Sequence, residues 1–362
     1  GLTMTGRRFA DLFGGPRREP ESDLTQREMD LARSVQAVTE DVVLNMARHV
    51  RNETDERRLV MAGGVALNCV ANGELVRSGI FDEVWFQPAA GDAGGALGAA
   101  YAAWHLSEGR DRTREPSDSM QGAYLGPSFT SDEAAAELES RGLTYARLST
   151  AALIDRVAEL LADGKTVGWF RGRMEFGPRA LGNRSVLADP RGRQVQRTVN
   201  LKIKYRESFR PFAPSVLEEQ AFEWFDLDTA SPYMLIVADV DGARVEGQGL
   251  ERLRRIESRI PAVTHVDGSA RIQTVSARTN PHYHALLSAF ERLTACPVLV
   301  NTSFNVRGEP IVCTPSDAVD CFLATHLDVL ALEDCLVLKS DIPDANQDLL
   351  TAEEAAARYG LD

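Results

Sequence analysis

The hydrophobic positions near the start of the chain follow a helical repeat. Thr25 and Glu28 match a capping box, and apolar residues then recur three or four positions apart. These residues are Leu31, Val35, Val38, Val42, Met46 and Val50. The spacing predicts one long amphipathic helix. Residues 1–23 are polar and rich in Gly, Pro and Arg, and they predict no regular element.

After this helix, short apolar runs alternate with glycine turns. Leu59–Ala62 predicts a buried strand that leads into Gly63-Gly64, and a second helix is expected to end near Arg77. Val84–Phe86 predicts another strand, and Asp92–Gly95 then opens an alanine-rich helix. Strand, glycine turn and helix in alternation predict an α/β layer with a largely parallel sheet.

A charged segment divides the chain into two expected domains. Residues 107–119 (SEGRDRTREPSDS) are nearly free of apolar side chains and predict a linker between domains at 1–106 and 120–362. Residues 241–260 are charged and predict a loop or a helix. The remaining expected elements are helices at Thr150–Ala162 and from Thr314, and strands at Thr166–Phe170, Ser185–Leu187, Tyr233–Val240, Cys296–Val300 and either Val329–Leu332 or Leu336–Leu338.

The composition narrows the class of protein. A chain of 362 residues can form two domains with separate cores, and 44% hydrophobic with 26% charged residues is typical of globular proteins. No apolar run approaches the ~18–20 residues that cross a membrane, and the first residues lack the apolar core of a signal peptide. The five cysteines form no CxxC pair, which disfavours a zinc ribbon and a disulfide scaffold. These features predict a cytoplasmic protein, and a net charge of −13 disfavours broad nucleic-acid binding.

One basic segment stands out from this acidic background. Between Lys165 and Arg210, twelve Lys or Arg residues accompany three acids, a local balance of +9. Such a concentration of charge attracts small anions. Arg179 and Arg184 lie among glycines and prolines that shape a loop, and guanidinium groups bind phosphate with two hydrogen bonds. Glu175 is a candidate to orient one of them.

Further candidates follow in the same half of the chain. Lys204, Arg206 and Arg210 add three cations, and Asn301, Ser303 and Asn305 offer amides and a hydroxyl at the end of a predicted strand. Together these residues predict a binding site for a phosphate-bearing substrate. The alternative is a solvated basic face, to which we assign Arg191, Arg193 and Arg197.

The glycine turns of the first half form a second candidate site. Gly63-Gly64 and Asn68 stand between a strand and a helix, where glycines let the backbone approach a ligand. Gly94-Gly95 repeat the arrangement, with Asp92 as a carboxylate that can ligate a metal. The alternative is that Asp92 caps a helix and the glycines are packing turns. Ligands in α/β folds bind beyond the carboxyl ends of strands, which favours the site.

Five segments in order make the chain recognisable. MAGGVALNCVANGEL and FQPAAGDAGGALGAA resemble the latter part of the actin-like ATPase domain of the O-carbamoyltransferases that modify antibiotics and nodulation factors. GRMEFGPRALGNRSVLADPR, LKIKYRESFRPFAPSV and LVNTSFNVRGEPIVCTPSDA resemble the YrdC-like C-terminal domain of that family. The resemblance runs from about Arg58 to Lys339. It implies an α/β fold in which the C-terminal half of an actin-like ATPase domain precedes a YrdC-like domain.

The resemblance also implies an enzyme, an ATP-dependent O-carbamoyltransferase. Carbamoyl phosphate and ATP would give carbamoyladenylate in the second domain, and the first would pass the carbamoyl group to a hydroxyl of a small-molecule natural product. ATP, Mg²⁺ and a divalent metal such as Fe²⁺ at Asp92 are the implied cofactors. The implied site residues are Lys204, Arg206 and Arg210 as catalytic cations, Glu175, Arg179, Arg184, Asn301, Ser303 and Asn305 around them, and Gly63, Gly64, Asn68, Gly94 and Gly95 on the nucleotide side.

The sequence departs from the family pattern in two places. The family supplies the other metal ligands from an HxxxH pair, and this sequence contains none. We therefore expect the N-terminal half of the actin-like domain to be absent, and the alternative function is a nucleotide-binding fragment that is inactive without it. Arg171 stands where the family commonly has Gln. The acceptor stays open, as does the oligomeric state, with a homodimer among the alternatives.

Overall fold

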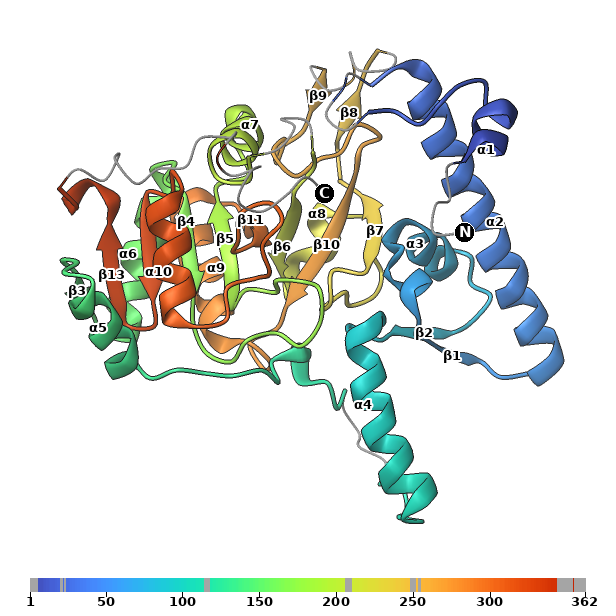
Figure 1. Cartoon of the computed structure of the whole chain (residues 1–362), viewed down its shortest axis with the longest axis horizontal. Coiled ribbons are helices and arrows are strands. Elements are labelled where there is room, and N and C mark those ends of the chain that lie inside the picture. Colours follow the sequence, from blue (N-terminus) through green and yellow to red (C-terminus); the bar gives the residue numbers. More distant parts are fainter. Residues whose placement is uncertain are drawn as a thin grey trace.

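A large mixed sheet forms the centre of the molecule (Figure 1). The computed structural model describes residues 6–19, 22, 24–113, 118–205, 210–247, 252, 255–343 and 354. Within these residues nine strands pair in the order β3-β13-β12-β4-β5-β11-β6-β10-β7. Their bounds are β3 Ala146–Arg147, β4 Val167–Phe170, β5 Arg184–Ala188, β6 Ala213–Leu217, β7 Ile236–Asp239, β10 Ser269–Val275, β11 Val298–Ser303, β12 Val329–Leu332 and β13 Cys335–Leu338.

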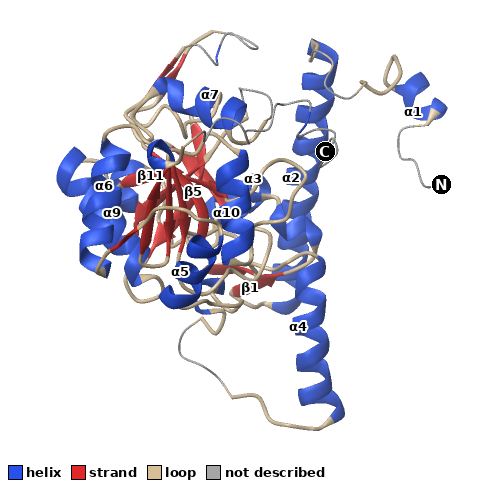
Figure 2. Ribbon diagram, turned by 60° about the vertical axis from the view of Figure 1, so that its left-hand side comes forward, coloured by secondary structure: helices blue, strands red, loops and turns tan. Residues whose placement is uncertain are grey.

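Helices cover both faces of this sheet. Figure 2 shows α6 (Thr150–Ala162) and α9 (Pro281–Thr294) on one side, and α5 (Ser131–Ser140) and α10 (Pro315–Ala324) on the other. Every residue of β4, β5, β6 and β12 is therefore buried, as in sheets that are covered on both faces. Two short helices complete this part of the chain, α7 (Arg193–Lys202) and α8 (Ala221–Trp224).

The pairing pattern makes the large sheet mixed. β4 runs parallel to β12 and β10 parallel to β6, whereas β5, β11 and β13 pair in antiparallel fashion with their neighbours. On β11, Asn301 lies opposite Leu187 of β5 and Ala213 of β6. The ends of β11 and β5 therefore bring Ser303 beside Ser185, where the loops of the candidate site begin.

A smaller N-terminal part carries two parallel strands, β1 (Arg58–Met61) and β2 (Glu83–Phe86). A short helix, α1 (Arg7–Leu12), comes first, so the prediction of no regular element in residues 1–23 was wrong in part. The capping box at Thr25 begins the 29-residue α2 (Gln26–Thr54), which packs against α3 (Cys69–Arg77). After β2, α4 (Asp92–Ala102) extends away from the sheet (Figure 1).

Helix α3 joins this part to the large sheet by covering the edge of β7. The buried Asn72 amide donates to the carbonyl of Leu235 at 2.9 Å, and Arg77 donates to the carbonyl of Val237 at 2.8 Å. A Cβ atom on Gly73 would lie 2.2 Å from the Val237 carbonyl oxygen, so only glycine permits this approach. The edge of the sheet is thus partly capped by hydrogen bonds from a helix.

The element predictions are largely confirmed. The long helix, the two parallel strands near Leu59 and Val84, and the helix at Thr150–Ala162 are present. The prediction that the strand at Leu59 is buried was wrong, because Val60 is 73% exposed. Both alternatives for the last strand form, as β12 and β13. The prediction for residues 241–260 was wrong in part, because β8 (Arg244–Val245) and β9 (Ile256–Glu257) pair there as short strands.

The boundary at residues 107–119 stays a prediction, and residues 114–117 lie outside the described part of the chain. None of the described helices combines the length and the apolar character that crossing a membrane requires.

Candidate functional site

A basic pocket of about 400 Å³ opens where β11 ends. Three cationic side chains and one carboxylate are among the residues that line it. The lining consists of Lys204, Arg210, Ser303, Asn305, Val306, Arg307, Gly308, Glu309 and Pro310. The structure brings together four residues that the sequence predicts in one site: Lys204, Arg210, Ser303 and Asn305. Arg206 lies outside the described residues.

Lys204 is the centre of this pocket and is only 3% exposed. Its ammonium donates to Oδ1 of Asn305 at 2.7 Å, to the Asn305 carbonyl at 2.9 Å, and to the carbonyl and hydroxyl of Ser303. The Ser303 hydroxyl in turn donates to Asn305 at 2.6 Å, and the Asn305 amide donates to the Glu309 carbonyl at 2.6 Å. This network fixes the loop after β11 around a buried positive charge.

Arg179 lies near a second arginine, Arg271 of β10, and outside the basic pocket. Burial is the main cause that lowers the pKa of Arg179 to about 10, and repulsion from Arg271 adds to it. Burial also lowers the pKa of Arg271. Neither guanidinium has a hydrogen bond or an ion pair with any described residue, and the buried Arg179 Nε has no acceptor. Cys69, the first residue of α3, is close enough to influence both.

This arginine pair shares a sheet face with the basic pocket. Side chains two residues apart in a strand point to the same face of the sheet. Arg271 therefore shares a face with Gln273 on β10, and Asn301 shares a face with Ser303 on β11. Gln273 and Asn301 are hydrogen-bonded to each other at 2.8 Å across β6, which identifies the common face. Strands lie ~4.8 Å apart, so Arg271 stands roughly 10 Å across the sheet from β11. The two cationic groups border one extended surface.

The β4–β5 loop, residues 171–183, lies over this face and is held there by hydrogen bonds from polar side chains of the strands. The Asn301 amide donates to the Ala180 carbonyl at 3.2 Å, and the Gln273 amide donates to the Leu181 carbonyl at 2.7 Å. Ser215 of β6 closes the network with a bond of 2.6 Å to Gln273. Asn301 therefore holds the loop that carries Arg179, and its role as a ligand contact stays a prediction.

Glu175 organises the same loop from inside. Its Oε1 accepts from the backbone N–H groups of Leu181 at 2.6 Å and Asn183 at 2.9 Å, while its buried Oε2 has no partner among the described residues. Burial raises the pKa of Glu175. That Glu175 orients an arginine stays a prediction, because its carboxylate bonds only to backbone N–H groups among the described residues.

Arg184 is completely buried at the start of β5. It donates to the carbonyls of Gly172 at 3.1 Å and Asn183 at 2.8 Å, and its guanidinium lies 3.5 Å from the centre of the Phe170 ring. Burial lowers its pKa to about 10. Arg184 thus supports the two ends of the β4–β5 loop.

The glycine turns of the N-terminal part have the open backbone that the sequence predicted. Gly63 has a φ of +95° and a Cβ added to it or to Gly64 would meet nothing within 4 Å. Asn68 is already engaged: it caps α3 through the Ala71 N–H at 3.1 Å and bonds to Gln36 of α2 at 2.9 Å. Its side chain therefore holds the turn in place, and ligand binding by Gly63 and Gly64 stays a prediction.

The second turn begins α4. Asp92 is its first residue, so the carboxylate lies in the favourable first turn of the helix. It is not the cap that the alternative predicted, because Gly91 holds the capping position and no side chain makes a capping hydrogen bond there. A Cβ on Gly94 would lie 2.2 Å from the Ala89 carbonyl oxygen, whereas Gly95 faces open space. The described residues contain no group of three His, Cys, Asp or Glu side chains that could hold a metal. These residues alone do not fit the implied metal centre.

Comparison with known proteins decides the family. The model of the carbamoyltransferase C-terminus matches residues 158–339, and the model of the carbamoyltransferase N-terminus matches residues 1–101. The chain belongs to the carbamoyltransferase family. The resemblance seen in the motifs of the sequence is confirmed, and with it the assignment to a family of enzymes.

Three relatives illustrate the range of the family. The chain is 56% identical over 364 residues to the uncharacterised protein sll1178 of Synechocystis, covering 98% of this chain and 59% of that protein. It is 45% identical to nodulation protein NolO of Bradyrhizobium diazoefficiens, covering 87% and 55%. It is 38% identical to the 3'-hydroxymethylcephem-O-carbamoyltransferase of Amycolatopsis lactamdurans, covering 78% and 49%. The chain spans about half to three-fifths of the length of these relatives.

Two cationic residues of the site were not predicted from the sequence. Arg271 stands in β10 outside any of the quoted family motifs, and Arg307 follows Asn305 by two positions in the loop that lines the basic pocket. The signal for Arg271 was present in the strand SARIQTV, where Arg and Gln alternate with apolar residues. A charge at such a position in a buried strand indicates a ligand or a partner.

Proposed function

We propose that this chain carries the activating part of an ATP-dependent O-carbamoyltransferase. Carbamoyl phosphate and ATP would bind across the sheet face between the basic pocket and the Arg179–Arg271 pair. The observation that carries the proposal is this pair of desolvated guanidiniums, which face no carboxylate among the described residues. Burying like charges without a counter-ion is costly, and the phosphates of a nucleotide would remove the cost.

The proposed reaction explains why cationic side chains are needed at both ends of the bound ligand. Hydrolysis of carbamoyl phosphate would break its P–O bond and give carbamate and phosphate. A carbamate oxygen would then attack the α-phosphorus of ATP, forming carbamoyladenylate as the bond to pyrophosphate breaks. Negative charge grows on the leaving pyrophosphate oxygens, and fixed guanidinium and ammonium groups stabilise it. Lys204 and Arg210 would act at one end of the ligand and Arg179 and Arg271 at the other.

The second half of the reaction would use the N-terminal part. We assign that part to the latter half of an actin-like ATPase domain and residues 120–362 to a YrdC-like domain. A small-molecule hydroxyl would take the carbamoyl group there, in line with the substrate named for the cephem enzyme. Mg²⁺ would accompany ATP. A metal at Asp92 would need ligands from outside the described residues.

The test is release of pyrophosphate from ATP in the presence of carbamoyl phosphate. Lys204→Met should lower the rate by at least about tenfold, because a charge-assisted hydrogen bond contributes ~1.5–3 kcal/mol. Lys202→Met is the matched control, since Lys202 is exposed on the same segment and should keep the wild-type rate. Arg210→Ala repeats the test without removing the Lys204 network. Unchanged rates in Lys204→Met and Arg210→Ala would refute the assigned pocket.

A second candidate function is a nucleotide-binding part that needs another segment to act. It is favoured because the described residues contain no group of three side chains that could hold the implied metal. Folded protein that binds ATP but releases no pyrophosphate would support this candidate and exclude activation by the chain alone.

A further inference from the structure

A second cleft, separate from the basic pocket, is unused by the proposed reaction. It has a volume of about 470 Å³ and lies where the β4–β5 loop meets the start of α9. Its lining is rich in arginine and amide side chains. The residues are Asp118, Gln121, Tyr124, Arg171, Gly172, Arg173, Asn183, Arg278, Thr279, Asn280, Pro281 and His282. We call this the arginine cleft.

The arginine cleft is positively charged in an acidic protein. Three arginines and one aspartate line it, in a chain whose net charge is −13. Asp118 is already bonded to the Tyr233 hydroxyl and to the Met120 N–H at 2.9 Å, so part of its charge is satisfied. The Arg278 side chain has no hydrogen bond or ion pair with any described residue. The Arg278 guanidinium is therefore available to bind an anion in the cleft.

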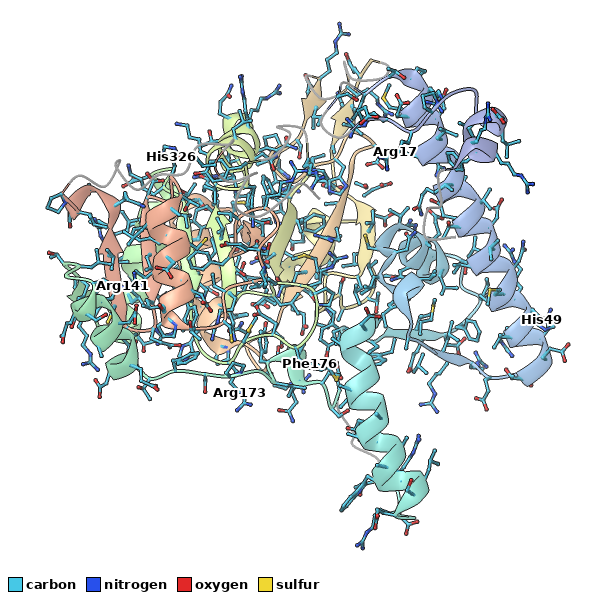
Figure 3. The ribbon with its side chains drawn as sticks, in the orientation of Figure 1. Arg17, His49, Arg141, Arg173, Phe176 and His326 are labelled. Atoms are coloured by element: carbon cyan, nitrogen blue, oxygen red, sulfur yellow. The ribbon has the colours of Figure 1, made fainter. Side chains whose placement is uncertain are left out.

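Arg173 provides the second accessible cation. It is exposed on the β4–β5 loop at the edge of the molecule (Figure 3), and Nη2 donates only to the Leu125 carbonyl, at 3.0 Å. The position of its backbone is fixed, because the buried Asn183 amide donates to the Arg173 carbonyl at 2.7 Å. Asn280 donates to Asn183 at 2.8 Å in turn. The walls of the cleft are thus linked by a buried hydrogen-bond network.

Arg171 forms the floor and leaves one donor unused. It is 7% exposed, and its Nη atoms bond to Asp334 at 2.9 Å, to the Glu333 carbonyl at 2.8 Å and to Thr150 at 2.8 Å. Its buried Nε–H has no acceptor among the described residues. This nitrogen is enclosed by the protein, so Arg171 shapes the floor of the cleft and leaves anion binding to the two exposed arginines.

The start of α9 adds a further attraction for anions. Asn280 caps the helix by accepting from the Tyr283 N–H at 3.1 Å, and Pro281 stands at the first helical position. The N–H of His282 belongs to the first turn, where backbone donors lack partners within the helix. The 14-residue helix directs its positive end toward the same cleft.

A smaller pocket continues from the arginine cleft. Its volume is about 290 Å³, and it shares Asp118, Arg278 and Thr279 with the cleft. Trp85 and Tyr233 line it, with their rings packed edge to face 6.5 Å apart. An anion on Arg278 would therefore have an aromatic wall beside it, which suits the organic part of a ligand.

We propose that the arginine cleft binds an organic phosphate, with the phosphate on Arg173 and Arg278 and the organic part toward Trp85. This inference does not depend on the proposed function, because the residues that carry it are outside the basic pocket. A guanidinium group can bind a phosphate with two hydrogen bonds, and Arg173 and Arg278 line the same cleft.

Calorimetric titration of the protein with ribose 5-phosphate tests this site. The double variant Arg173→Gln/Arg278→Gln should weaken the binding about tenfold or more, because two charge-assisted contacts are lost. Arg244→Gln removes one charge from an exposed position on β8 and should leave the binding unchanged. Lys204→Met should also leave this binding unchanged, since it alters only the basic pocket.

Each possible result either supports or overturns the proposed phosphate site. Ribose without phosphate should not bind, and inorganic phosphate should bind more weakly than the ester because it lacks the contact with Trp85. An isotherm of the double variant that matches the wild type overturns the site. Binding that is lost in Lys204→Met and kept in the double variant assigns the phosphate to the basic pocket and likewise overturns it.

Discussion

Replacing either arginine of the Arg179–Arg271 pair should make the protein more stable while it impairs anion binding. Most substitutions of half-buried residues destabilise a protein. This pair is different because both side chains are charged and desolvated, and neither has a counter-ion among the described residues. Arg179→Met and Arg271→Met keep much of the apolar stem and remove the charge.

The size of the effect follows from the pKa of Arg179. A lowering from 12.5 to about 10 corresponds to about 3 kcal/mol against the charged form, at ~1.4 kcal/mol for each pKa unit. At neutral pH the group is protonated in the folded and the unfolded chain, so this cost is fully present. It is relieved only as the pH rises from about 10 toward 12.5. Because solvent reaches part of the side chain, we expect a net gain of about 1–2 kcal/mol.

The assay is urea unfolding with and without pyrophosphate. Each methionine variant should raise the free energy of unfolding without ligand. Pyrophosphate should stabilise the wild type, by ~2.7 kcal/mol at a hundredfold excess over the Kd, and should stabilise the variants much less. Arg191→Met is the control, because Arg191 is paired with the buried Asp189 at 2.6 Å and its loss should destabilise.

One result would refute this reasoning. If both methionine variants lose stability as Arg191→Met does, the guanidiniums of Arg179 and Arg271 are neutralised in the folded protein. The proposed phosphate site between them would then lack its physical basis.

Two further predictions concern the β4–β5 loop. Gly182→Ala should destabilise by about 2–4 kcal/mol in urea unfolding, because φ is +104° and the new Cβ would lie 2.1 Å from the Tyr283 ring. Gly142→Ala, with a φ of +65° and free space around it, should cost only ~1 kcal/mol, and equal costs would contradict the predicted clash. Glu175→Gln should become increasingly stabilising relative to the wild type as the pH rises above 4.5, since burial raises the pKa of Glu175 and its ionised form is the costly one. A stability difference that is independent of pH would show that the pKa of Glu175 is the same in the folded and the unfolded chain, which would contradict the effect of burial.

The sequence predicted the elements well because their signals are local. The apolar repeat from Leu31 to Val50 and the capping box at Thr25 lie within a single helix, and both are present in α2. The pairing of the large sheet is not local, since β10 joins β6 and β7 from distant parts of the chain. No periodicity along one strand determines its neighbours, so the mixed order of nine strands was not predicted.

The same distinction applies to the site. Ser303 and Asn305 were correctly grouped with Lys204, although what brings them together is a contact between a loop and a strand end; the family motifs supplied that information. Arg184 and Asn301 were chosen for their chemistry, and the structure shows that they hold the β4–β5 loop. Arg271 was missed because its significance comes from Arg179, which is remote in sequence and adjacent in space.

The surrounding fold explains how the two like charges of the arginine pair are held close together. Arg271 lies on β10, next to the edge strand β7, and Cys69 at the start of α3 lies near both guanidiniums. Helix α3 is held against β7 by the bonds of Asn72 and Arg77 to backbone carbonyls. Those contacts form whether or not the pair is neutralised, so they fix the distance between the helix start and the sheet. The repulsion between Arg179 and Arg271 is therefore maintained by the surrounding fold, and a phosphate group that binds between them gains the free energy of removing it.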